Sequence, residues 1–418
     1  MIKINLKKNV TFWSSLGAGF EYYDFVVFAY LAPFLSQVFF QGSETVSLIN
    51  TYMIYAVGYF ARPLGSFVYG AVGDVKGRYK TFLNIMYTMA ASTLGIGLLP
   101  SYESIGIAAP VLLFILRFIQ GLSFGAELPG AIIVVSENLE KKKQGSHCGF
   151  ILSSVSLGSI LASTGVLFIT SFYSSEDIIS WMWRIPFLIG GVFGIFNLLI
   201  RRNLQETTEF LSIQKTQSHK ALWDPLKEVL QNQKGFIGAG IALGFILATL
   251  VTTNIYFPVL LSKLYGHEKA DIYLCITLAL IWCALLNPIF GRLGDHIGRH
   301  NLFLSTGIFF ILLISPIFGF LEKGFWGLLC FCLLFQTFIA GFVSSYFPIL
   351  VASFQTNIRF TSIAVCYNVT YALVNILPAI LASIDLTPSL LTLILMGIGV
   401  VSLVGNWVLS QKSEKTRF

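Results

Sequence analysis

The chain has 418 residues, of which 55% are hydrophobic and only 11% carry a charge, and its mean hydropathy is +0.76. Charged residues make up about a quarter of a typical soluble domain, so this composition excludes a soluble globular protein. The formal charge of +7 comes from 27 Lys and Arg against 20 Asp and Glu. The basic residues are concentrated in alternate loops, and this indicates orientation in a membrane rather than nucleic-acid binding.

Apolar runs long enough to cross about 30 Å of hydrocarbon recur along the whole chain. Only one long polar segment, residues 203–233, interrupts them, and it separates six spans from six. The expected spans, within three or four residues at each end, are 11–40, 47–73, 81–100, 105–136, 147–172, 183–202, 234–262, 270–290, 301–320, 326–353, 361–383 and 388–410.

The sequence therefore predicts an all-α membrane protein with twelve transmembrane helices in two pseudo-symmetric bundles. The N-terminal six-helix bundle covers residues 1–202, a cytoplasmic linker covers 203–233, and the C-terminal six-helix bundle covers 234–418. In the linker, Leu222, Leu226, Val229 and Leu230 fall at helical spacing, so the segment after Ala221 is either a helix on the membrane surface or a plain tether.

The basic residues predict the topology of the chain. They number 21 in the N-terminal tail, the C-terminal tail and the alternate loops on one side, among them Lys141 to Lys143, against three on the other side. Because Lys and Arg accumulate on the cytoplasmic side, both termini are expected in the cytoplasm. The first apolar run contains Glu21 and Asp24 and lacks a cleavage site of small residues, so we interpret it as a span rather than a signal peptide.

Glu21 and Asp24 lie near the middle of the first span. A charge at that depth costs about 3 kcal/mol unless it faces a partner or water. Their spacing of three residues places both on one face of the helix. We predict that they face the protein interior and take part in proton coupling; a buried ion pair that only joins helices is the alternative.

In the second span, Tyr52, Tyr55, Tyr59 and Arg62 share one helix face. An arginine this deep in the membrane requires an acid, and Glu21 or Asp24 is the expected partner. Arg62, Tyr59 and Tyr55 are therefore candidate substrate-binding residues, although aromatic stripes also arise from ordinary packing.

A glycine-rich charged segment follows the second span and returns 221 residues later. Residues 70–83 (GAVGDVKGRYKTFL) and 291–304 (GRLGDHIGRHNLFL) match at seven of fourteen positions. Such a repeat between long apolar runs predicts a duplicated bundle whose halves each place this segment, as a turn, at one membrane face. A basic loop that only sets the topology is the alternative.

Four polar or aromatic residues, Arg117, Gln120, Phe124 and Glu127, lie on one face of the fourth span. Ionisable residues inside a span usually mark a transport pathway. Arg117 and Gln120 are therefore candidate substrate-binding residues, and Glu127 is a third candidate for proton coupling.

The spans of the second half carry hardly any charge. Neutral polar and aromatic residues there can supply hydrogen bonds and aromatic walls, which predicts proton coupling in the first half and substrate shaping in the second. The candidates for substrate binding are Asn254, Tyr256, Tyr367, Asn368 and Tyr371.

These motifs resemble the major facilitator superfamily, whose most specific signature is the segment from Gly70 through Gly73 and Asp74 to Gly77 and Arg78. Within it the chain is similar to the metabolite:proton symporters, the group of the proline/betaine, citrate, oxoglutarate and shikimate carriers. Four stretches carry this resemblance, namely Glu21 to Phe25, Arg62 to Gly65, Gln120 to Glu127, and Trp183 to Phe187.

Two positions depart from that family pattern. Gly125-Ala126 stands where a double glycine is usual, and the loop before the eleventh span, residues 354–359, lacks the acid and proline that often precede its arginine. The second departure predicts a weakened gate contact at that loop.

The expected function is a proton-coupled symporter that imports a small zwitterionic or carboxylate metabolite across the bacterial cytoplasmic membrane by alternating access. Aspartates close to helix N-termini can accept hydrogen bonds there and close the cytoplasmic side. The expected gate residues are Gly73, Asp74, Gly77 and Arg78, with Gly294, Asp295, Gly298 and Arg299 from the repeat.

Alternatives are an importer or exporter of a citrate-like polycarboxylate or carboxylate siderophore, and a multidrug-type efflux antiporter. We expect no enzyme activity, because the histidines and cysteines form no catalytic or metal-binding cluster. The expected partners are the small-molecule substrate, the proton and the lipid bilayer, with no nucleic acid, cofactor or metal, and the expected functional unit is a monomer.

Overall fold

The computed structural model describes residues 10–140, 143–201, 224–374 and 387–415. This part of the chain is helical, without strands, which confirms the predicted all-α fold. Its long helices are α1 (Val10–Phe39), α2 (Glu44–Lys76), α3 (Arg78–Leu98), α5 (Ala108–Glu137), α6 (Gln144–Phe172), α8 (Arg184–Arg201), α11 (Lys234–Tyr265), α12 (Lys269–Ile297), α13 (Arg299–Phe318), α14 (Gly324–Ser353), α15 (Arg359–Val374) and α17 (Pro388–Lys415).

These twelve helices agree with the twelve predicted spans. Nine helices of the described residues are long and apolar enough to cross a membrane, and a bent pair, Ser175–Met182 with Arg184–Leu199, makes a tenth if it counts as one span. The tyrosines and glycines of α2 lower its mean hydropathy, and the described part of α15 has only 16 residues. Large apolar side chains on the outside, such as Phe60 at 65% and Trp326 at 74% exposed, form a surface suited to lipid.

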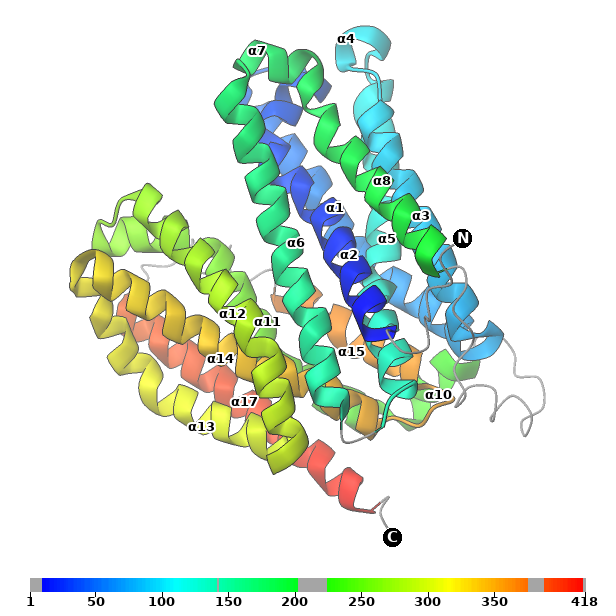
Figure 1. The fold of residues 1–418 in the computed structure, drawn as a ribbon, viewed down its shortest axis with the longest axis vertical. Helices are drawn as coiled ribbons and strands as arrows, with labels where there is room; N and C mark the ends of the chain where they lie inside the picture. Colours follow the sequence, from blue (N-terminus) through cyan, green and yellow to red (C-terminus); the bar gives the residue numbers. More distant parts are fainter. Residues whose placement is uncertain (1–9, 141–142, 202–223, 375–386, 416–418) are drawn as a thin grey trace.

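The helices form two bundles of six, α1 to α8 and α11 to α17 (Figure 1). In the N-terminal bundle, α1 packs on α6, α2 on α5 and α3 on α8; in the C-terminal bundle, α12 packs on α14, and α17 packs on α11 and α13. The bundles meet where α2 contacts α15 and where α6 contacts α12.

Short helical segments lie at the ends of the bundles. They are α4 (Tyr102–Ile105), α7 (Ser175–Asp177), η3 (Ile178–Met182), α10 (Asp224–Asn232) and η4 (Gly319–Glu322). Most of the predicted linker over residues 203–233 lies outside the described residues. Its described part, α10, contacts α2, α11 and α15, whereas the domain boundaries at 202 and 233 stay predictions.

Each repeated glycine-rich segment is helical on both sides of a single glycine, so the predicted turn is confined to that one residue. Helix α2 continues to Lys76 and α12 to Ile297, seven residues beyond the predicted end at 290. The chain reverses only at Gly77 and Gly298, whose φ angles of 111° and 94° favour glycine. The other glycines of the segment serve close helix contact instead.

We call the end of the molecule that carries Gly77 and Gly298 the turn face. The two bundles touch near this end, in the lower part of Figure 1. At the opposite end the two bundles diverge. In Figure 1 the N-terminal bundle ends with α4 and α7 at the top of the view, whereas the C-terminal bundle ends with the turn between α13 and α14 at the left edge.

Candidate functional site

At the turn face, Asp74 of α2 binds the first turn of α15. Its carboxylate accepts the backbone N–H groups of Phe360 at 3.2 Å and of Thr361 at 2.9 Å, and the Thr361 hydroxyl at 2.8 Å. The first N–H groups of a helix have no partner within the helix and carry its positive dipole end, so they suit a carboxylate. A bond of this kind joins the two bundles.

Asp295 of α12 makes the equivalent contact with α6. Its two carboxylate oxygens accept the backbone N–H groups of Gly145 and Ser146, each at 2.9 Å. Arg299 lies 3.7 Å from Asp295 and donates to the Gln144 side chain at 3.1 Å. The repeat in the sequence thus becomes a repeated contact in which an aspartate of one bundle binds a helix N-terminus of the other.

Glycines allow these helix pairs to approach closely. A Cβ atom on Gly73 would overlap the Phe360 ring, and one on Gly291 would overlap the backbone of Gly145. Among the other predicted gate residues, Gly294 lies against Leu302 of α13. The side chain of Arg78 lies outside the described part of the chain.

A third contact between the bundles is an ion pair of Glu137, at the end of α5, with Arg359, at the start of α15. Arg359 also donates to the carbonyl of Phe354 at 3.2 Å. The departures in the loop 354–359 predicted a weakened contact here, yet this arginine does reach the other bundle. Sequence reasoning missed Glu137 because its partner is 222 residues away.

Inside the N-terminal bundle, a chain of hydrogen bonds joins Arg117 to Asp24. Arg117 donates to the Gln120 side chain, and Gln120 donates to the Thr93 hydroxyl at 2.9 Å. Thr93 donates to Asp24 at 3.4 Å. Arg117 also donates to the carbonyl of Phe25 at 2.9 Å, so this fully buried guanidinium is held within one bundle.

The ion pair predicted for Arg62 with Glu21 or Asp24 does not form in the part of the chain that the structure describes. Among the described residues, neither Arg62 nor Arg117 makes an ion pair with a carboxylate. Glu21 instead accepts a hydrogen bond from Asn197 of α8 at 3.1 Å, and Asp24 packs beside Gly190 of α8 as well as Thr93. Both acids therefore face α3 and α8, while Arg62 lies on the side of α2 that meets the other bundle.

Arg62 lies at the contact between the bundles and donates to the hydroxyl of Tyr367, on α15, at 3.3 Å. Its guanidinium is surrounded by aromatic rings that include Tyr59 and Tyr371. The Tyr55 ring instead lies against Arg117, with its centroid 5.0 Å from that guanidinium. The hydroxyls of Tyr55 and Tyr59 form a hydrogen bond of 3.1 Å. The tyrosines predicted on one face of α2 thus contact different arginines: Tyr59 lies against Arg62 and Tyr55 against Arg117.

Glu127 and Asn368 also lie in the buried region near this contact. Asn368 donates to the backbone carbonyl of Gly125, which joins α15 to α5. Neither carboxylate oxygen of Glu127, which is 2% exposed, has a hydrogen-bond partner among the described residues. The predicted substrate-binding side chains of Asn254 and Tyr256 lie outside the described part of the chain.

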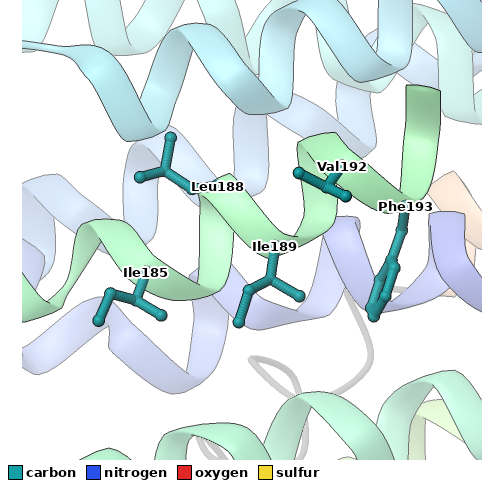
Figure 2. Close-up of a pocket in the computed structure, with 5 residues that line it drawn as sticks. All are labelled: Ile185, Leu188, Ile189, Val192 and Phe193. Carbon is teal, nitrogen blue, oxygen red and sulfur yellow. The ribbon is translucent and has the colours of Figure 1, made fainter. Parts of the chain in front are cut away.

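A separate groove on α8 offers only apolar contacts. Figure 2 shows its lining residues, Ile185, Leu188, Ile189, Val192 and Phe193. A polar metabolite needs hydrogen bonds or charges for recognition, so this groove is not the candidate site.

Comparisons with known proteins agree with the fold described above. The family model described as Major Facilitator Superfamily matches residues 14–365. The proline/betaine transporter of Salmonella typhimurium is 31% identical over 391 residues, which cover 90% of this chain and 77% of that protein. The glycine betaine/proline/ectoine/pipecolic acid transporter OusA of Dickeya dadantii is 29% identical over 403 residues, with the same shares covered.

Among solved structures, the proton:xylose symporter XylE bound to 6-bromo-6-deoxy-D-glucose has a TM-score of 0.72 and 16% identity to this chain. The alignment covers 97% of this chain and 95% of that one. At this identity the likeness shows the fold alone, and it extends over both bundles.

Proposed function

Because the chain belongs to the Major Facilitator Superfamily, we propose that it is a proton-coupled symporter that imports a small zwitterionic or carboxylate metabolite by alternating access. The predicted resemblance to the metabolite:proton symporters is confirmed by the proline/betaine transporters it matches. The chain is a multi-pass membrane protein of the bacterial inner membrane and transports a small molecule. The proton, the direction and the residues involved are our proposals, as are the monomeric unit and cytoplasmic termini.

The buried guanidinium of Arg62 is the observation that carries this proposal. It is 4% exposed, lies where the bundles meet, and has no carboxylate partner among the described residues. A buried charge without a counter-ion is costly. A substrate carboxylate would supply that counter-ion, and arginine binds carboxylates well because its planar fork can donate two parallel hydrogen bonds.

We assign proton coupling to the acidic residues of the N-terminal bundle. Asp24 is connected to Arg117 through Gln120 and Thr93, so a change of protonation at Asp24 can alter the hydrogen bonds around Arg117. Glu127 is the second candidate, since an ionised carboxylate without a partner is costly to bury. Glu21, already bound by Asn197, is the third.

We assign gating to the contacts of Asp74 and Asp295 with the helix N-termini of the opposite bundle. The basic residues of the sequence predict that the turn face lies on the cytoplasmic side. Each contact joins one bundle to the other, so rocking of the bundles must break both contacts to open that side. Gly73 and Gly77, with Gly294 and Gly298, would set the helix spacing and the chain reversal; Arg78 and Arg299 would add charge pairing.

A polycarboxylate such as citrate is less well supported than a zwitterion. A tricarboxylate needs several cations, yet Arg117 is fully buried and already donates to Phe25 and Gln120. Of these two buried arginines, Arg62 is then the one placed to meet substrate, and one arginine suits one carboxylate.

Purified protein in liposomes with an imposed gradient, acidic outside, tests the proposed function. Labelled glycine betaine or L-proline should accumulate above its outside concentration, and a protonophore should abolish the accumulation. Arg62→Gln should remove uptake, whereas Val192→Ala, in the apolar groove on α8, should not. Extrusion of substrate on the same gradient would indicate an antiporter, and accumulation of citrate alone would indicate a polycarboxylate carrier.

A further inference from the structure

The guanidinium of Arg62 is enclosed by aromatic rings from four helices of both bundles. Its central carbon lies 4.7 to 5.8 Å from five ring centroids. We call these rings the Arg62 cage; they belong to Phe25 of α1, Tyr59 of α2, Phe124 of α5, and Tyr367 and Tyr371 of α15. Rings within about 6 Å of a cation attract it through their negative faces.

Polar contacts satisfy little of this guanidinium. Arg62 has five N–H donors, yet among the described residues it donates one hydrogen bond, to the Tyr367 hydroxyl, and its Nε has no partner. The cage thus offers ring faces for a cation but no anion. This side chain is held mainly by interactions that another cation could replace.

Arg117 provides an internal comparison. It also lies over aromatic rings, those of Phe25, Phe28 and Tyr55, at 4.4 to 5.0 Å. However, Arg117 donates to the Phe25 carbonyl and to Gln120, and all of these partners belong to the N-terminal bundle. The Nε of each arginine has no partner among the described residues, but Arg117 donates two hydrogen bonds and Arg62 donates one, and of the two arginines Arg62 is the one whose rings come from both bundles.

We propose that the guanidinium of Arg62 and a quaternary ammonium group of the substrate compete for the Arg62 cage. The substrate carboxylate draws Arg62 into an ion pair, and the methylated ammonium takes the place of the guanidinium between the rings. This proposal rests on the proposed function and narrows its substrate class to N-methylated zwitterions.

The cage favours methylated nitrogen over nitrogen that carries hydrogen. Its ring faces are weak acceptors, the Tyr59 hydroxyl is bonded to Tyr55, and the Tyr367 hydroxyl accepts from Arg62. Each N–H of a primary or secondary ammonium would lose its hydrogen bond to water without full replacement. A trimethylammonium has no N–H to satisfy and presents its charge through methyl groups to the rings.

A methylation series tests this selectivity with the purified full-length protein. Binding of glycine, sarcosine, N,N-dimethylglycine and glycine betaine is measured by thermal shift and by displacement of labelled betaine. We expect affinity to rise along the series, about tenfold or more in total, which is the range of desolvated cation–π contacts. Tyr371→Leu should flatten the series, whereas Tyr371→Phe, which keeps the ring, should preserve it. Phe338→Leu, a buried ring in α14 that packs on Phe310, is the matched control.

Competition with Arg62 has its own test, because tetramethylammonium has the cation but no carboxylate. It should not bind the wild-type protein measurably, since it cannot draw Arg62 from the cage. In Arg62→Ala the cage loses its resident cation, so this variant should bind tetramethylammonium while its betaine affinity falls. Adding Tyr371→Leu to Arg62→Ala should remove the gained binding.

The outcomes separate this inference from the proposed function. A flat series with intact betaine and proline transport, or no gain of tetramethylammonium binding in Arg62→Ala, overturns the cage competition and leaves the symporter proposal standing. Binding of citrate but of none of the amino acids overturns the cage competition and also replaces the zwitterion of the proposed function with a polycarboxylate.

Discussion

Two sets of buried polar groups in the described residues differ in where their partners lie. Inside the N-terminal bundle, Arg117, Gln120, Thr93 and Asp24 bond to one another. Between the bundles, single contacts cross from one bundle to the other: Asp74 to the start of α15, Asp295 to the start of α6, Glu137 to Arg359, and Arg62 to Tyr367.

This difference follows from what each set must do if the bundles rock. Hydrogen bonds within one bundle persist when that bundle moves as a unit, so several of them can be linked into one chain. Bonds between bundles must break in each cycle, and their groups then need another partner. At the turn face, water can replace the lost partner of a carboxylate or of a helix N-terminus. Arg62 lies within the membrane, so its replacement partner is the substrate.

The two buried arginines test this comparison with the largest expected effects. Arg62→Ala and Arg117→Ala should each lower uptake more than 100-fold, but only Arg117→Ala should also lower the thermal unfolding midpoint clearly. It leaves the Phe25 carbonyl and Gln120 without their donor, at about 1–3 kcal/mol for each buried group. Uptake in liposomes and thermal unfolding of the same preparations measure both effects.

Arg117→Lys is the control for that pair. A lysine keeps the charge but lacks the planar fork that reaches both Phe25 and Gln120, so stability should return only in part. Equal unfolding midpoints for Arg62→Ala and Arg117→Ala would contradict the distinction between the two sets.

Asp24→Asn tests whether the set inside the bundle carries the coupling. This variant should still exchange labelled substrate in counterflow but lose gradient-driven accumulation, which for one coupled proton is at most about tenfold per pH unit. Glu21→Gln should have the milder effect, because Asn197 rather than Thr93 binds Glu21. Continued accumulation in Asp24→Asn would place the proton site elsewhere, and Glu127→Gln would be tested next.

The fold was predictable because its signals are local. Apolar run length gave the spans, basic loops predicted their orientation, and helical spacing placed Arg117, Gln120 and Glu127 on one buried face. The second half gave weaker signals, since neutral residues such as Tyr367 do not stand out until the structure places them beside Arg62.

Partners of charged groups were not predictable, because they depend on helix rotation and on residues far away in sequence. Proximity in chain order suggested acids for Arg62, yet α1 is rotated so that Asp24 faces Thr93 and Glu21 faces Asn197. Both partners are neutral and follow no periodic pattern. The glycines of the repeat suggested turns, whereas most serve close contact between helices, which only the packed bundles reveal.

Asp74→Asn probes the set between the bundles and should shift the equilibrium toward an open turn face. The amide keeps the size of the side chain but loses the charge that favours the α15 N-terminus, worth about 1.5 kcal/mol, or tenfold in the open population. A cysteine at the buried position Ser362, in a background without native cysteines, reports opening by its labelling rate. Asp295→Asn should act similarly through α6, and unchanged labelling in both variants would remove the gate assignment.

Breaking the ion pair of Glu137 with Arg359 should open the turn face less than the changes above. The variants of the two residues should also differ from each other in how much they open it. The side chains are 1% and 13% exposed, so Glu137 is the more deeply buried partner. Glu137→Gln leaves Arg359 with its bond to the Phe354 carbonyl and with access to water, so opening should rise only about threefold. Arg359→Gln removes the cation from the deeper carboxylate and should raise opening more.

The double variant of Glu137 and Arg359 completes the thermodynamic cycle. Because both changes remove one shared contact, the labelling rate of the double variant should lie near that of Arg359→Gln rather than at the product of the two single effects. Additive effects would mean that the two residues act independently, and the contact would then count as packing at the turn face rather than as a bond that the transport cycle must break.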